Sequence, residues 1–287
     1  MTSISIVIPA FQAARTIDLV LGSALPQATA HGAEIIVVES SADGYAAALQ
    51  QRWPAVDVVA LDSRAYPGRA RNIGAARATG EVIVFLDADA VPEPGWLSGL
   101  LDALAASRWA AAGAIANGTP GSPTGTAGWL LEFSNWLPGA RDVPDHAASA
   151  SLAVRRRALD EAGGFLNDVW PGEDTILTFP WGTTGRLAFA PTAVVTHLNR
   201  TRVQDLLRHQ IALGRAFGEV CAAVPFDHCR FGRRPWSALA GILRLLALAR
   251  RLRRRPREAA LALLLSPWLL IGLVAWTIGL WRHGRDL

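Results

Sequence analysis

The sequence predicts an α/β fold for about its first 200 residues and apolar helices at its C-terminal end. In the first part, short β-branched apolar runs alternate with helical patterns, as in folds built on a parallel sheet. One of these runs, residues 82–86, ends in two carboxylates, Asp87 and Asp89. Further on, residues 259–281 contain no charged side chain.

The elements follow one another as strand, helix, strand, helix, strand, helix, strand. Strands are predicted at residues 4–8, 34–39, 56–61 and 82–86, with helices at 15–24, 45–52 and 69–78. Pro67 begins the third helix and Gly80 ends it. The later elements are a helix opening at 92–96, a strand at 109–116, a loop at 117–126 and an amphipathic helix at 203–220.

The composition is that of a chain with a large core and two oppositely charged parts. Of the 287 residues, 51% are hydrophobic, which is enough for one large or two ordinary domains. Residues 1–200 carry 13 Arg against 19 Asp and Glu, whereas residues 201–287 carry 15 Arg against 5 acids. Cys221, His228 and Cys229 lie close together, but they are too few for a zinc site, so we expect both cysteines to be reduced thiols.

The C-terminal region, residues 221–287, is predicted to associate with a membrane. As a helix, residues 259–281 would be about 35 Å long, enough to cross a bilayer core. The apolar segment at 236–249 is shorter and suits an interfacial or re-entrant helix. Between them, residues 250–257 include six arginines, which favours anionic lipid over nucleic acid as a partner. With no signal peptide pattern at the N-terminus, we expect a cell-membrane protein whose remaining part faces the cytoplasm.

The two carboxylates after residues 82–86 indicate a site for a metal and a nucleotide. Ligands of open α/β sheets bind beyond the carboxyl ends of the strands, and hard divalent cations that bridge phosphates are held by one or two carboxylates. The second predicted strand also ends in an acid, Glu39. The glycine patterns of dinucleotide dehydrogenases and P-loop enzymes are both missing from the sequence.

Several sequence blocks carry a resemblance to a known family: residues 3–11, 35–41 and 69–74, Asp87-Ala88-Asp89, and residues 163–165 followed by 170–174. In these blocks the chain resembles the family 2 glycosyltransferases of the GT-A fold, in their membrane-associated bacterial form. The resemblance implies a nucleotide-diphospho-sugar transferase domain over residues 1–220, with a Rossmann-like mixed sheet flanked by helices.

For the donor, the resemblance implies that Glu39 accepts hydrogen bonds from the nucleobase, in a position where the family usually has Asp. Pro9 and Phe11 would line the same donor site. Arg69 and Arg71 either contact phosphate or base, or lie on a solvated helix face.

For the metal, the resemblance implies that Asp89 coordinates Mn2+ or Mg2+ bridging the two phosphates. Asp87 would face the ribose and the metal shell. His197 either completes the metal or diphosphate shell or has a structural role.

For catalysis, the resemblance implies Asp174 as the general base, with Glu173 as the second candidate and helix capping as the alternative role. Trp170 is the candidate acceptor contact. Residues 175–179 lack the Arg that often follows this motif in the family.

The function predicted from these features is metal-dependent, inverting transfer of a sugar from a nucleotide-sugar donor to an acceptor in the cell envelope. The acceptor would be a lipid-linked molecule or a growing glycan. The alternatives are a sugar-nucleotide nucleotidyltransferase, for which residues 9–15 are a poor match, and an inactive membrane scaffold, which the presence of Asp87, Asp89 and Asp174 disfavours.

Overall fold

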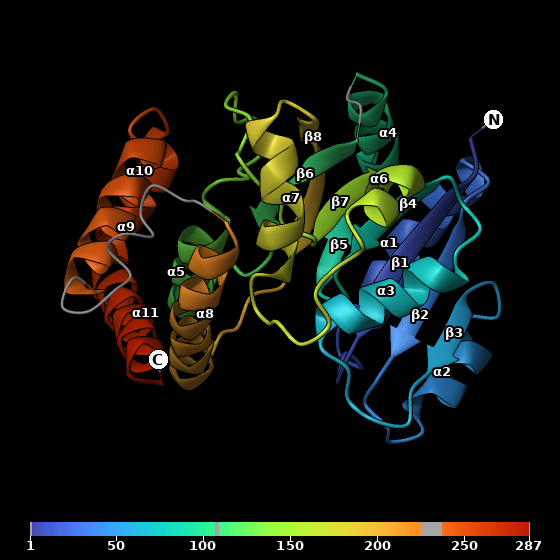
Figure 1. Ribbon diagram of the computed structural model, residues 1–287, viewed down its shortest axis with the longest axis horizontal. Helices are drawn as coiled ribbons and strands as arrows, with labels where there is room; N and C mark the ends of the chain where they lie inside the picture. Colours follow the sequence, from blue (N-terminus) through green and yellow to red (C-terminus); the bar gives the residue numbers. More distant parts are fainter. Residues whose placement is uncertain (1, 107–108, 225–236, 287) are drawn as a thin grey trace. The chain divides into compact units, whose positions relative to one another are not determined.

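The computed structural model describes residues 2–106, 109–224 and 237–286, and the chain divides into two compact units. The first unit comprises Met1–Ala116 and Trp136–His197, and the second comprises Asn117–Asn135 and Leu198–Leu287. The first unit is built on a sheet, and the second is helical (Figure 1).

The sheet of the first unit is mixed and has the strand order β3-β2-β1-β4-β7-β6-β8-β5. Its strands are β1 (Ile4–Ala10), β2 (Glu34–Glu39), β3 (Asp57–Ala60), β4 (Val82–Leu86), β5 (Ala90–Pro92), β6 (Ala110–Asn117), β7 (Ser151–Arg155) and β8 (Leu187–His197). The four N-terminal strands pair in parallel, whereas β4 with β7, β6 with β7 and β5 with β8 are antiparallel. The mixed α/β sheet implied by the sequence is confirmed.

The helices of the first unit connect these strands and cover the sheet (Figure 1). They are α1 (Ile17–Ala30), α2 (Tyr45–Arg52), α3 (Pro67–Arg77), α4 (Trp96–Ala106), α6 (Arg156–Glu161) and α7 (Glu173–Thr183). Helix α1 runs six residues beyond its predicted end and through Pro26, with Ala24 and Ala28 both buried. The predicted alternation of strands and helices up to β4 is therefore confirmed, with shifted boundaries.

Helix α3 packs close to β1 at Gly74. A Cβ at this position would lie 2.3 Å from Val7 Cγ1 and 3.2 Å from Val38 Cγ2, which is too close for any side chain. Because α3 begins beside the carboxyl ends of the parallel strands, this approach fixes the position of the arginine-bearing segment at 69–71.

We expect Gly74→Ala to lower the free energy of unfolding by about 2 kcal/mol, because the methyl group must displace Val7 in a packed core. Gly22→Ala is the matched control. Gly22 also lies inside a helix, but a Cβ there would be 3.8 Å from its nearest neighbour, so alanine should raise the stability by about 0.5 kcal/mol. Urea unfolding of both variants measures the two effects, and equal changes would show that the α3–β1 contact is not tight.

The second unit contains α5 (Pro123–Phe133), α8 (Val203–Ala223), α9 (Ser237–Leu252), α10 (Pro256–Leu264) and α11 (Ser266–Asp286). Helix α5 begins within the segment predicted as a loop, because the Ser122 hydroxyl accepts a hydrogen bond from Gly125 N and Pro123 occupies the first turn.

The prediction of one continuous helix over residues 259–281 is wrong. The chain breaks at Leu265, and α10 and α11 meet at an angle of 78°. Pro267 explains the break, because it cannot donate a backbone hydrogen bond to Leu263 and its ring would clash with that carbonyl. Within the described ranges no single helix has both the length and the apolar character needed to cross a membrane. The bent pair formed by α10 and α11 is long enough and apolar enough when its two helices are counted together.

Cys221, near the end of α8, is disulfide-bonded, so the expectation of a reduced thiol at this position is wrong. His228 and Cys229 lie outside the described residues.

Candidate functional site

The two carboxylates that follow β4 lie beside the histidine that ends β8. Strands β5 and β8 pair with Ala90 opposite His197, which brings Asp89 next to the imidazole, 3.3 Å from Asp89 Oδ1 to His197 Nε2. One ligand atom each from Asp87, Asp89 and His197 lies within 4.8 Å of the others. Carboxylates suit Mg2+ and Mn2+, and the imidazole is also a common transition-metal ligand, so this donor set fits a divalent cation. The three predicted metal residues are brought together.

Arg71 joins this cluster to the start of α7. Its side chain is 3% exposed, and its two terminal nitrogens donate to Asp87 Oδ1 at 2.7 Å and to Glu173 Oε1 at 2.6 Å. The guanidinium also lies over the Phe165 ring, 5.4 Å from its centroid. Arg71 therefore does not lie on a solvated face, whereas Arg69, two residues earlier on α3, is exposed.

The loop at residues 163–167 is held against α3 by Asn72, whose role the sequence did not reveal. Asn72 Oδ1 accepts from Phe165 N at 2.9 Å, and its Nδ2 donates to Phe165 O at 2.8 Å. Gly68 allows the close approach, since a Cβ there would lie 2.4 Å from Leu166 O. An asparagine inside a helix is a weak signal for such a contact, because this residue type is unfavourable there unless its amide has a partner.

Glu173 and Asp174 begin α7 but have different surroundings. Glu173 is buried and paired with Arg71. Asp174 is half-buried, and its Oδ2 accepts from Ser149 N at 3.0 Å and from Ser149 Oγ at 3.2 Å. Ser149 precedes β7, and no pattern in the sequence distinguished it. The structure thus separates a carboxylate that balances a buried arginine from one that is partly accessible.

Burial is the largest influence on the pKa values of Glu173 and Asp87. It raises the pKa of Glu173 to about 7, although attraction by Arg71 opposes this change. It also raises the pKa of Asp87, against the attraction of Arg71 and together with repulsion from Asp89. The negative charge crowded around Arg71 raises the pKa of its guanidinium, so this group stays charged.

Glu39, at the end of β2, is buried and holds its own loop. Its Oε1 accepts from Ser41 N at 3.0 Å and from the Ser41 hydroxyl, which in turn accepts from Gln12 N at 2.8 Å. The hydrogen bonds connect the loops after β1 and β2, so the predicted donor residues Pro9, Phe11 and Glu39 belong to neighbouring strand ends.

A row of flat side chains runs from Phe11 to Trp170. The Arg64 guanidinium lies 4.5 Å from the Phe11 ring centroid and 5.8 Å from that of Tyr66. Tyr66 in turn stacks on Trp170, with centroids 6.2 Å apart and the planes 11° from parallel. The predicted donor residue Phe11 and acceptor residue Trp170 are thus linked by Arg64 and Tyr66, which sequence analysis did not single out.

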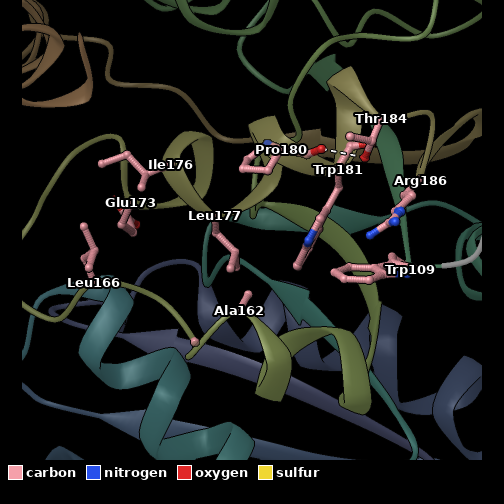
Figure 2. Close-up of a pocket in the computed structure, with 11 residues that line it drawn as sticks. Trp109, Ala162, Leu166, Glu173, Ile176, Leu177, Pro180, Trp181, Thr184 and Arg186 are labelled. Atoms are coloured by element: carbon pink, nitrogen blue, oxygen red, sulfur yellow. Dashed lines mark hydrogen bonds between the residues drawn. The ribbon is translucent and has the colours of Figure 1, made fainter. Parts of the chain in front are cut away.

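An apolar groove of about 400 Å³ runs along one face of α7 (Figure 2). Figure 2 shows Leu166, Glu173 and Ile176 at one end, and Trp109, Trp181 and Arg186 at the other. The α7 residues in the groove follow the i, i+3, i+4, i+7, i+8 pattern of one helix face, and Asp174 is not among them. The groove therefore lies on the Glu173 side of the helix.

Comparison with known proteins agrees with this geometry. The family model described as Glycosyl transferase family 2 matches residues 5–161, which is more than half of the chain. The pre-mycofactocin glycosyltransferase of Mycobacterium tuberculosis is 31% identical over 163 residues, covering 52% of this chain and 33% of the relative. Polypeptide N-acetylgalactosaminyltransferase 15 of Mus musculus is 33% identical over 217 residues, covering 66% of this chain and 33% of the relative. The chain spans about a third of the length of these curated relatives.

Solved structures share the fold. The mannosyltransferase PcManGT from Pyrobaculum calidifontis, in complex with GDP-Man and Mn2+, superposes with a TM-score of 0.66 at 21% identity, covering 98% of this chain and 86% of the other. GalNAc-T7, with UDP, GalNAc and Mn2+, gives a TM-score of 0.56 at 17% identity, covering 87% of this chain and 54% of the other. At these identities the likeness shows the GT-A fold alone.

Residues 5–161 contain the strand ends that carry Glu39, Asp87 and Asp89 and the helix that carries Arg71. The same segment contains nearly all of the parallel half of the sheet, together with β5, β6 and β7. On the match over this segment, the chain belongs to glycosyl transferase family 2.

Proposed function

We propose that the protein transfers a sugar from a nucleoside-diphosphate sugar to an acceptor hydroxyl, with inversion at the anomeric carbon and with a bound divalent cation. The observation that carries the proposal is the link made by Arg71. It joins Asp87, in the candidate metal cluster, to Glu173, the neighbour of the candidate base. The buried Arg71 side chain therefore joins the candidate metal cluster to the first turn of α7, which also carries the candidate base Asp174.

Asp87, Asp89 and His197 would hold Mn2+ or Mg2+. When bound, the cation supplies positive charge that neutralises the diphosphate leaving group. The contribution of the chain is to place two carboxylates and an imidazole at one edge of the sheet. Arg71 keeps Asp87 in place from the side of α3.

Asp174 would accept the proton of the acceptor hydroxyl. As the acceptor oxygen forms its bond to the anomeric carbon and the bond to the diphosphate breaks, the proton passes to the carboxylate. Two features support Asp174 over Glu173: it is partly accessible, and Ser149 orients it, whereas the Glu173 carboxylate is buried against Arg71.

Glu39, Pro9 and Phe11 would line the donor nucleoside. The exposed ring of Phe11, beneath the guanidinium of Arg64, offers a flat surface of the kind on which a base stacks. Arg69, exposed on α3, would be available to phosphate. The solved relatives include complexes with GDP-Man and with UDP-GlcNAc, so the identity of the base is a question for direct binding.

The acceptor would be a lipid-linked molecule or a growing glycan of the cell envelope. Trp170, stacked on Tyr66, presents the kind of aromatic face against which a sugar ring packs. The apolar groove beside Glu173 could accommodate the non-sugar part of such an acceptor. We propose that the catalytic unit faces the cytoplasm, on the same side of the membrane as the arginine run at 250–257.

Calorimetric titration with UDP, GDP and dTDP, each with Mn2+ and with EDTA, tests the donor and metal parts of the proposal. We expect one nucleotide to bind only with Mn2+, and Asp89→Ala to weaken that binding by about 100-fold or more, because a ligand of the cation is lost. Asp102→Ala, which removes an exposed acid on α4, is the control and should bind normally. Equal binding in EDTA, or unchanged binding by Asp89→Ala, would contradict the metal assignment.

A further inference from the structure

Large apolar side chains are exposed on three helices of the second unit. On α10, Leu263 and Leu264 are 78% and 72% exposed. On α9, Ile242 and Leu246 are more than half exposed. The three helices α9, α10 and α11 lie next to one another at the orange and red end of the chain (Figure 1), and we call their exposed apolar side chains the α9–α11 apolar surface.

On α11 the exposed side chains form one stripe. Leu270, Val274, Ile278 and Trp281 recur every three or four residues and are all exposed, so they lie along one side of the helix. A different side carries Leu269, Leu273, Trp276 and Leu280, which are buried. Helix α11 therefore presents apolar residues both to its own bundle and to its surroundings.

Tight packing against α8 prevents α11 from turning this stripe inward. A Cβ at Gly279 would lie 2.1 Å from Ile211 O, and one at Gly214 would lie 1.9 Å from Trp276 O. Such contacts leave no room for rotation about the helix axis. The exposed stripe is thus a fixed feature of the fold, and soluble surfaces rarely expose apolar patches of this kind.

Exposed arginines adjoin the apolar surface. Arg250 and Arg251 end α9, Arg253 and Arg254 lie in the link to α10, and Arg257 is in the first turn of α10; all five are exposed. Arg244 differs, because it is turned into the bundle, where it donates to Gln210 Oε1 and Leu131 O. Arg251 donates to Ser134 Oγ, and the exposed side chains of Arg250, Arg253, Arg254 and Arg257 can meet an anionic partner.

We infer that the α9–α11 apolar surface inserts into a lipid bilayer whose surface is anionic, with the arginines of residues 250–257 at the headgroups. Aliphatic side chains beside a dense basic cluster match the two layers of such a membrane, an apolar interior and a negatively charged surface. Membrane insertion does not depend on sugar transfer. Its failure would leave the proposed activity intact, and the loss of activity would leave insertion intact.

Flotation of the 287-residue chain with lipid vesicles tests the inference. We expect the protein to float with vesicles containing about 30% phosphatidylglycerol and to bind pure phosphatidylcholine more weakly, with the difference removed by high salt. The triple variant Leu270→Gln/Val274→Gln/Ile278→Gln should lose binding to both by about tenfold or more. The variant Arg253→Gln/Arg254→Gln/Arg257→Gln should lose only the preference for anionic vesicles, by roughly 100-fold at low salt.

Leu19→Gln is the matched control, because Leu19 is 57% exposed on α1, close to the 51% of Leu270, and lies outside the α9–α11 apolar surface. It should float like the wild type. Unchanged thermal melting and metal-dependent nucleotide binding establish that each variant is folded. The inference is overturned if the wild type does not float, if the triple apolar variant floats equally well, or if light scattering without lipid shows a stable dimer that this variant abolishes.

Discussion

The Asp174→Asn variant is expected to turn over about 1,000-fold more slowly than the wild type, with unchanged affinity for the donor nucleotide. The amide has the shape of the carboxylate, and its oxygen can still accept the hydrogen bond from Ser149 N that holds Asp174 Oδ2 at 3.0 Å. It cannot take a proton from the acceptor hydroxyl. The loss should therefore be in kcat, measured with saturating donor and acceptor, while calorimetry with the nucleotide and Mn2+ gives wild-type binding.

Two further variants separate the roles of the neighbouring groups. Ser149→Ala removes the 3.2 Å hydrogen bond from its hydroxyl but keeps the one from its backbone, so we expect only about a tenfold loss in kcat. Glu173→Gln keeps a side chain that can accept a hydrogen bond from Arg71 and should retain more activity than Asp174→Asn. If Asp174→Asn instead keeps a tenth or more of the wild-type kcat while Glu173→Gln is inactive, Glu173 is the base.

Local pattern was enough to predict the parallel half of the sheet and, shifted by one residue, strand β6 of the antiparallel half, but not β7. The strands β2 and β4 have the predicted bounds because their β-branched apolar runs are buried on both faces. Strand β7, residues Ser151–Arg155, was not predicted, because a short run of this composition becomes a strand only when β4 and β6 lie beside it. Pro267 was visible in the sequence, but only the folded chain shows that it lies in the first turn of a separate helix, α11, which follows a break at Leu265.

In the candidate site, too, the residues that could be predicted are those next to a single strand, and the residues that could not are brought in by contacts between distant parts of the chain. Asp87 and Asp89 could be found because they follow one strand directly, whereas His197 reaches them only through the pairing of β5 with β8. For Arg71 the sequence left two interpretations, contact with phosphate or base and a solvated helix face, and neither anticipated its buried pairing with Asp87 and Glu173. The partner of a charged side chain 102 residues away in the chain is decided by tertiary packing, which spacing along α3 does not encode.

Replacing Arg71 should strongly reduce the stability of the fold. We expect Arg71→Met to lower the free energy of unfolding by about 3–5 kcal/mol at about pH 8, because it leaves Asp87 and Glu173 as partly or fully buried carboxylates without their cation. Urea unfolding measures the loss. Arg77→Met is the control, because Arg77 is also on α3 and also paired, with Asp57, but is 62% exposed and should change stability little.

The loss should shrink as the pH falls. Burial already raises the pKa of Glu173 to about 7 with Arg71 present, and the pKa should rise further without it. An acid whose folded pKa lies above its unfolded value, about 4.5, binds more protons in the folded state, so its contribution to stability declines as the pH rises between these values. Arg71→Met should therefore be closer to the wild type at about pH 5.5 than at about pH 8. An equal loss at both values would contradict the proposed origin in unpaired carboxylates.

A double-mutant cycle decides whether Arg71 acts through Glu173. Adding Glu173→Gln to Arg71→Met removes one of the two negative charges that Arg71 balanced, so the double variant should be more stable than Arg71→Met alone, and its stability loss should depend less on pH in this range. Asp87 would still lack its partner, so metal-dependent nucleotide binding should stay weak in the double variant. If Glu173→Gln instead restores nucleotide binding together with stability, Arg71 contributes only to the stability of the fold. If it restores stability but not binding, Arg71 is a positioning residue that holds Asp87 for the metal.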